Sequence, residues 1–189
     1  RGFETKIFKA LKIANHQYKI AEYRGQYPLI KIGLKEVKGN SYQEIEDKIR
    51  YQVKQMFTDH DYLANSSVLT NLQKLQLSEY LTADFDTILI ESSIKFLSQV
   101  LHKHFGQEVY ILVDEYDTPI NDSYIQFYKD GKGEFDKVIR LFQGLFGFGL
   151  KGNTSLKKGL VTGILRVAKA NIFSGLNNVT EDCLLDEEF

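Results

Sequence analysis

The sequence predicts an α/β fold, a three-layer sandwich in which helices flank a central parallel sheet. Short apolar runs at residues 29–34, 109–114 and 159–165 have the length and composition of strands. Longer segments with apolar residues at every third or fourth position lie between these runs and predict helices. Strands that alternate with helices are joined by crossover connections, which make the strands parallel.

Two helices are predicted around the first strand. Apolar residues at helical spacing over residues 3–14 indicate a short entry helix. Pro28 stands at the beginning of the strand, where a missing backbone N–H is tolerated. After the strand, Ser41 and Glu44 have the spacing of a capping box, and the apolar stripe behind them predicts a helix from about 42 to 58.

A small insert and a long helix are predicted before the second strand. Residues 59–86 are polar with scattered leucines, which indicates one or two short helices that form an insert or lid. An apolar stripe that begins at Thr87 predicts a helix to Phe105. Gly106 follows at the position of a left-handed helix cap.

Two further helices are predicted between the second and third strands. Thr118 and Pro119 open a loop and a short helix to about residue 128, and the polar, glycine-rich segment 129–133 interrupts the chain. A longer helix is expected from 134 to about 150. Its glycines at 144, 147 and 149 stand among phenylalanines and leucines, so we assign them to close helix packing rather than to phosphate binding.

Composition favours a single domain over all 189 residues, in a reducing compartment. The 24 basic and 25 acidic side chains give a net charge of −1, which provides no general attraction to nucleic acid or to an anionic membrane. The lone cysteine, Cys183, cannot form an internal disulfide, and no apolar stretch approaches the roughly 18 residues of a membrane span.

His102 and His104 stand two apart on a helix, so they point apart and are better placed to interact with the helix dipole than to bind zinc. We therefore expect a cytoplasmic protein without a zinc site.

The most informative segment is Val-Tyr-Ile-Leu-Val-Asp-Glu at residues 109–115. A short apolar run of this kind suits a strand buried in an α/β sheet, and Asp114 and Glu115 then emerge at its carboxyl end, where such sheets bind ligands. This is the form of a Walker B element, in which the first acid holds Mg²⁺ and the second orients or deprotonates the water that attacks a γ-phosphate. The alternative is a pair of turn or helix-capping acids, and Asp117-Thr118 before a proline has that character.

The phosphate-binding half of such a site is not visible in the sequence. No Gly-x-x-x-x-Gly-Lys-Ser/Thr loop occurs in the 189 residues, and the only Gly-Lys pair, at 131–132, lies in a predicted turn. The chain begins at Arg1 without a methionine, so we expect the phosphate loop and its strand to precede it. On this interpretation the chain is the Walker B and sensor part of an ATPase-like domain.

Separated blocks of the sequence carry a resemblance to a known family. They are Tyr-Pro at 27–28 with the strand that follows, Asp-Glu-Tyr-Asp-Thr-Pro-Ile at 114–120, and Thr-Gly-Ile-Leu-Arg-Val-Ala-Lys at 162–169 running into Ile-Phe-Ser-Gly-Leu-Asn-Asn at 172–178. Together they closely resemble a bacterial family of predicted AAA-ATPase-like domains, over nearly the whole chain. The resemblance implies a P-loop NTPase of the STAND or archaeal-ATPase type, often fused to a restriction-endonuclease-like nuclease domain.

This resemblance implies a three-layer P-loop NTPase-like sandwich whose first, phosphate-loop strand is missing from this chain, with the strand at 109–114 between the other two. It also implies ATP and Mg²⁺ as ligands, with Asp114 holding the metal and Glu115 the attacking water. Thr162 and Arg166 bracket the end of the third strand, where ATPases of this type keep a polar residue that senses the γ-phosphate. An equally good alternative for Arg166 is an ion pair with Asp117 that holds the site together.

The leading hypothesis is a domain that binds and hydrolyses ATP and acts as a nucleotide-dependent switch on other domains of a larger bacterial protein. The rival is an ATPase-like scaffold or interaction module that has lost its phosphate loop. A third interpretation makes Asp114, Glu115 and Asp117 a metal-dependent nuclease centre, which would need a lysine on the adjoining strand, and Lys31 is the candidate. Without a phosphate loop, we expect this chain alone to bind ATP weakly and to hydrolyse none.

Overall fold

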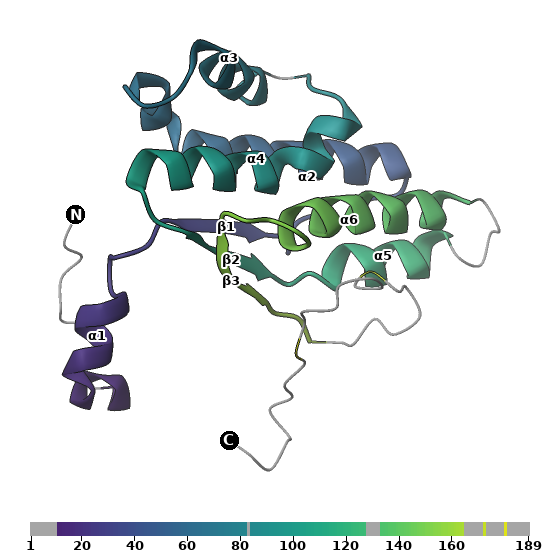
Figure 1. Cartoon of the computed structure of the whole chain (residues 1–189). Helices are drawn as coiled ribbons and strands as arrows, with labels where there is room; N and C mark the ends of the chain where they lie inside the picture. The colour runs from purple at the N-terminus through teal and green to yellow at the C-terminus, as the bar shows by residue number, and fades with distance from the viewer. Residues whose placement is uncertain (1–10, 83, 128–132, 165–171, 173–179, 181–189) are drawn as a thin grey trace.

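The structure, a computed structural model, describes residues 11–82, 84–127, 133–164, 172 and 180. Its centre is a parallel sheet of three strands, β1 (Leu29–Gly33), β2 (Val109–Asp114) and β3 (Leu156–Val161), in the order β1-β2-β3 (Figure 1). The prediction of parallel strands with 109–114 in the middle is confirmed.

The third strand lies earlier in the sequence than its apolar run predicts. β3 covers Leu156–Val161, whereas the run predicts 159–165. Residues 157–160 are all exposed, so burial does not mark the limits of this strand. Pairing with β2 does, because Lys158 lies in register with Tyr110 and Val161 with Val113.

Helices connect the strands at nearly the predicted places. Those described are α1 (Gln17–Tyr23), α2 (Tyr42–Thr58), α3 (Asn71–Tyr80), α4 (Thr87–Phe105), α5 (Thr118–Phe127) and α6 (Glu134–Leu150), with the 3₁₀ turns η1 (Lys12–Asn15) and η2 (Asp61–Asn65). The helices predicted at 42–58, 87–105 and 134–150 are confirmed, as is the short helix from Thr118. Within the described part of the chain, no helix is both long and apolar enough to cross a bilayer.

Local hydrogen bonds explain where two of these helices begin and end. The Ser41 hydroxyl accepts the backbone N–H of Glu44 at 3.2 Å at the start of α2. The Glu44 carboxylate accepts the N–H of Asn40, at 2.9 Å, so the predicted capping box forms with its return bond one residue away from Ser41. At the end of α4, Gly106 has a φ of 67°, which is the predicted left-handed cap.

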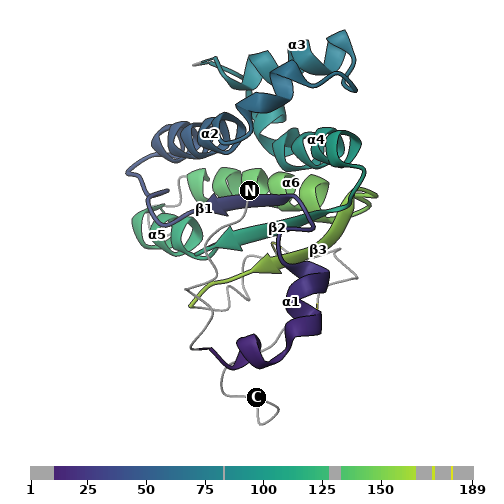
Figure 2. The same cartoon turned by 90° about the vertical axis from the view of Figure 1, so that its left-hand side faces the viewer.

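The predicted insert at 59–86 consists of short helices. η2 and α3 stack on α2 and α4, on the side away from the sheet (Figures 1 and 2). The entry helix predicted at 3–14 differs from the structure where it can be compared. Residues 3–10 lie outside the described residues, and Lys12–Asn15 forms a 3₁₀ turn rather than an α-helix.

The described helices divide into layers around the sheet. α2, α4 and α6 cover one face, and α1 lies on the other side (Figure 2). On the helix-covered face, Ile30, Ile32, Ile111 and Val113 are at most 2% exposed and form the centre of the core. On the opposite face, Leu160 is 59% exposed. The α/β sandwich with a parallel sheet is therefore confirmed.

Two glycines let α6 approach α4 closely. A Cβ atom on Gly144 would lie 2.5 Å from the carboxyl carbon of Glu91, and one on Gly149 would lie 2.9 Å from Cγ2 of Ile94. Gly147 differs, because a Cβ atom there would meet nothing within 4 Å. The predicted packing role is confirmed for Gly144 and Gly149 and is wrong for Gly147.

Candidate functional site

The predicted acidic pair lies at the edge of the sheet where the strands end. Asp114 is the last residue of β2 and is exposed, and Glu115 follows it directly. α5 begins at Thr118, at the same edge (Figure 1). Parallel sheets bind their ligands at this carboxyl edge, because the strand ends leave a crevice lined by loops and helix N-termini.

Thr162, the predicted sensor residue, lies beside Asp114. Its hydroxyl donates a hydrogen bond of 2.7 Å to Asp114 Oδ1. Backbone hydrogen bonds hold it there, since its N–H donates to Val113 O at 2.8 Å and its carbonyl accepts the N–H of Tyr116 at 3.1 Å. The fold thus brings together a carboxylate and a hydroxyl that are 48 positions apart in the sequence.

Glu115 has a backbone conformation that is rare for its residue type. Its φ is 55°, and among the described residues it is the only one besides glycine with a positive φ. This left-handed region costs an L-residue about 1–2 kcal/mol, so surrounding contacts must maintain it. Thr118 contributes such contacts: its N–H donates to Glu115 O at 3.1 Å and its hydroxyl to Glu115 Oε2 at 3.4 Å. Backbone strain of this kind gathers at functional sites.

Asp117 combines a predicted role with one that the sequence does not indicate. Its carbonyl accepts the N–H of Asn121 at 2.9 Å at the start of α5, which agrees with a turn or N-cap position. Its side chain, however, is only 4% exposed and accepts the N–H of Ile164 at 3.2 Å. An aspartate before Thr-Pro carries no signal of a contact 47 positions further along the chain.

Two predicted residues remain, Arg166 and Lys31. Arg166 lies outside the described residues, so both its phosphate contact and its pairing with Asp117 stay predictions. Lys31, which the nuclease alternative requires, is exposed on β1. It lies two residues before Gly33, the register partner of Asp114, which is roughly 7 Å along the strand.

The oxygen atoms at this edge suit a hard cation such as Mg²⁺. Asp114, Thr162 and Glu115 offer carboxylate and hydroxyl oxygens, which hard cations prefer. The described ranges contain no group of three or more His, Cys, Asp or Glu that could form a metal cage. At nucleotide sites in general, Mg²⁺ keeps several waters and uses only one or two protein carboxylates together with substrate phosphates. His104 lies elsewhere, 2.8 Å from Ser66 Oγ through its Nδ1.

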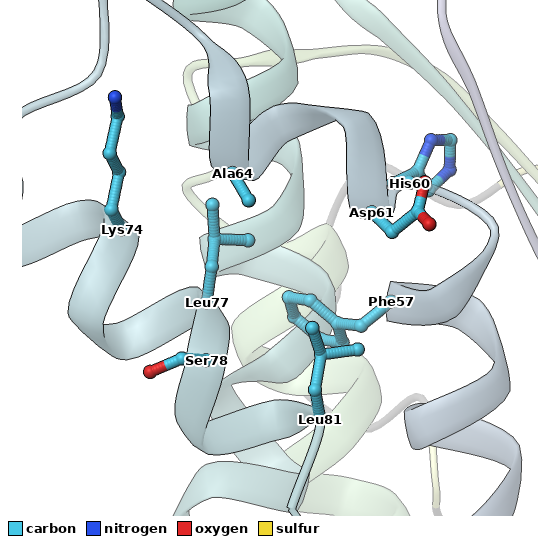
Figure 3. A pocket seen from close by; sticks show the side chains of 8 residues that line it. All are labelled: Phe57, His60, Asp61, Ala64, Lys74, Leu77, Ser78 and Leu81. Carbon is cyan, nitrogen blue, oxygen red and sulfur yellow. The ribbon is translucent and has the colours of Figure 1, made fainter.

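A small cavity lies away from these acids, between the end of α2, η2 and α3 (Figure 3). Its volume is about 50 Å³, and apolar side chains such as Phe57, Leu77 and Leu81 line it together with polar ones. Ligand pockets for nucleotide-sized molecules run to several hundred Å³. The cavity is therefore no candidate for the ATP site.

A parallel sheet with crossover helices on one face and an acidic pair at the end of its middle strand defines a P-loop-like α/β sandwich. Within that class, the family described as "Predicted AAA-ATPase" (AAA-ATPase-like) matches residues 2–173 of the 189, and the chain belongs to this family. No curated protein and no solved structure matches the chain. The predicted family is confirmed, and the fusion to a nuclease domain stays a prediction.

Proposed function

We propose that this chain supplies the Walker B and sensor part of a domain that binds and hydrolyses Mg-ATP and uses its nucleotide state to switch a larger protein. One observation carries this function: Asp114 and Thr162 are hydrogen-bonded at the ends of neighbouring parallel strands, and Glu115 follows directly. Membership of the Predicted AAA-ATPase family supports ATP as the ligand.

Each residue has a separate task in this reaction. Asp114 would hold Mg²⁺, directly or through a water that Thr162 helps to orient. The ion would neutralise charge on the phosphates when bound. Glu115 would orient the attacking water and accept its proton, and its left-handed backbone would set where its carboxylate lies. Arg166 would contact the γ-phosphate through its forked donors.

A phosphate loop would complete the site from the side of β3. In the described part of the chain, β3 pairs with β2 and its other edge is open. A parallel strand along that edge would end beside Thr162, and a loop after it would face Asp114. Because an open, exposed strand edge invites aggregation, natural proteins usually pair or cover it. Such a strand would cover this edge of the sheet.

Nucleotide binding by the full-length protein tests this function. We expect Asp114→Ala to remove the Mg²⁺-dependent part of the affinity for a non-hydrolysable ATP analogue, measured by calorimetry with Mg²⁺ and with EDTA. Asp122→Ala is a matched control, because it also removes a carboxylate, but one that lies in α5 and accepts the N–H of Gly39, at 3.0 Å. It should bind the analogue as the wild type does.

Different results would support the alternatives. If the full-length wild-type protein binds no Mg-ATP, the scaffold interpretation accounts better for the fold. If residues 1–189 alone bound ATP with micromolar affinity, the phosphates would bind within these residues and not at a separate phosphate loop. Mg²⁺-dependent DNA cleavage that is lost in both Asp114→Ala and Lys31→Ala would favour the nuclease centre.

A further inference from the structure

Asp117 is a buried carboxylate to which the proposed ATPase chemistry gives no task. A carboxylate that leaves water is costly to the fold unless its oxygens accept hydrogen bonds. Its Oδ2 accepts the N–H of Ile164 at 3.2 Å and Nδ2 of Asn121 at 3.3 Å. One donor belongs to α5 and the other to the chain that leaves β3. Asp117 therefore joins the acidic turn to the end of the neighbouring strand.

Gly163 brings the same two segments into direct contact. A Cβ atom on Gly163 would lie 2.6 Å from Asp117 Oδ1 and 2.7 Å from Cε1 of the Tyr116 ring. Atoms do not approach so closely, so a larger residue at position 163 would push the segment away from the turn. This contact is independent evidence that the chain after β3 packs directly against Asp117.

The hydrogen bonds between these segments form a short ladder. Thr162 lies at one end, where its hydroxyl donates to Asp114 Oδ1 and its carbonyl accepts the N–H of Tyr116. Ile164 lies at the other end, bound to Asp117. Since only Gly163 separates the two residues, the position of Ile164 constrains the position of the Thr162 hydroxyl over Asp114.

We propose that Asp117 is a positioning residue for the Asp114–Thr162 pair. By holding the backbone at Ile164, it keeps the Thr162 hydroxyl on Asp114 and sets the geometry in which Asp114 binds a divalent cation. This role rests on the proposed function, because it presumes that Asp114 is the cation ligand. A purely structural role at the start of α5 would also lower stability when Asp117 is lost, but it would not act through Thr162.

Cation affinity separates the two roles. The probe is Mn²⁺, a spectroscopic substitute for Mg²⁺, titrated into the purified full-length protein in the presence of the non-hydrolysable ATP analogue and followed by electron paramagnetic resonance. We expect Asp117→Ala to weaken Mn²⁺ binding about tenfold or more, the usual effect of losing a residue that orients a metal ligand. Asp117→Asn keeps an oxygen acceptor for Ile164 and should lie closer to the wild type. Asp122→Ala should leave the affinity unchanged.

A double-mutant cycle shows whether Asp117 acts through Thr162. In a Thr162→Val background, the hydroxyl that Asp117 positions is gone, so adding Asp117→Ala should weaken Mn²⁺ binding no further. Fully additive effects of the two substitutions would overturn the positioning role. So would an Asp117→Ala variant that binds Mn²⁺ as tightly as the wild type.

Hydrogen exchange keeps the two proposals distinguishable. If the wild type binds no Mn²⁺ in the presence of the ATP analogue, the proposed function fails, and the positioning role is then judged by exchange alone. Asp117→Ala should speed amide exchange at least tenfold at residues 162–164 while the exchange of α2 stays as in the wild type. Unchanged exchange at 162–164 would overturn the positioning role, whether or not the cation binds.

Discussion

The α4–α6 interface and the acidic turn after β2 are built in opposite ways. At the interface, Ile94 of α4 is fully buried and lies directly against Gly149 of α6. At the turn, Asp114 is exposed and Glu115 is half-buried, and hydrogen bonds join both residues to hydroxyl and backbone groups. Side-chain packing stabilises the interface, whereas hydrogen bonds stabilise the turn and maintain its strained backbone.

This difference separates stability from the proposed chemistry. Burial of apolar area dominates the free energy of folding, so changes at the interface should alter the melting temperature and leave nucleotide binding intact. Changes at the turn should alter binding or turnover at little cost in stability, as is common where a strained site carries function. Each of the following predictions tests one side of this comparison.

The largest expected effect is on turnover, at Glu115. In the full-length protein, Glu115→Gln should lower ATP hydrolysis on the order of 10²–10⁴-fold, because glutamine keeps the shape of the side chain but cannot accept the proton of the attacking water. Mg-ATP affinity and melting temperature should stay as in the wild type. Steady-state hydrolysis and calorimetry check this, and unchanged turnover would count against a catalytic role of Glu115.

The next effect is on stability, at the interface. Gly149→Ala places a Cβ atom 2.9 Å from Cγ2 and 3.1 Å from Cβ of Ile94, and these atoms lie near the backbone of α4 and cannot swing away. Overpacking of this kind costs about 1–3 kcal/mol of unfolding free energy. Urea unfolding measures the loss, and the Mn²⁺ affinity of the turn should not change.

Gly147→Ala is the control within the same helix. A Cβ atom there meets nothing within 4 Å, so the substitution should raise the unfolding free energy by roughly 0.5–1 kcal/mol through better helix propensity. If both alanine variants shift the urea midpoint in the same direction, close packing at Gly149 does not determine the stability of the interface.

A gain in stability of similar size is expected when the strain at Glu115 is relieved. Glycine adopts the φ of 55° without steric cost, so Glu115→Gly should raise the unfolding free energy by roughly 0.5–1 kcal/mol while abolishing turnover. Glu115→Ala removes the same carboxylate but keeps the strain. A melting temperature of the glycine variant at or below that of the alanine variant would contradict stored strain at this residue.

The smallest effect concerns pH, at the interface. Burial raises the pKa of Glu91, which packs against Gly144, above its ordinary value of 4.5. A raised folded-state pKa means that Glu91 destabilises the folded protein in its charged form, so the contribution is favourable at low pH and is lost as the pH rises through that pKa. Glu91→Gln should therefore melt slightly higher than the wild type at pH 7 and equally at pH 3.5. Thermal scans across this range check the trend, and a difference that grows toward low pH would contradict it.

Sequence reasoning succeeded where local signals were complete. The bounds of α2, α4 and α6 follow from apolar periodicity and from terminal residues such as Ser41 and Gly106, which act within a few positions of themselves. It failed where the structure depends on a partner strand. The start of β3 at Leu156 could not be read from its exposed side chains, since pairing with β2 decides it.

Three features could be predicted from the sequence alone: the fold class, the order of helices and strands, and the position of Asp114 and Glu115 at the end of a buried strand. These features rest on patterns in which interacting residues are neighbours along the chain. Three others depend on the folded chain: Thr162 donates to Asp114, Asp117 accepts the N–H of Ile164, and Glu115 has a left-handed backbone conformation. The first two contacts join residues 47 or 48 positions apart, and the third is a conformation that glutamate adopts only because the surrounding turn enforces it. Such distant contacts leave no periodicity in a single sequence, so the fold has to be formed before they exist.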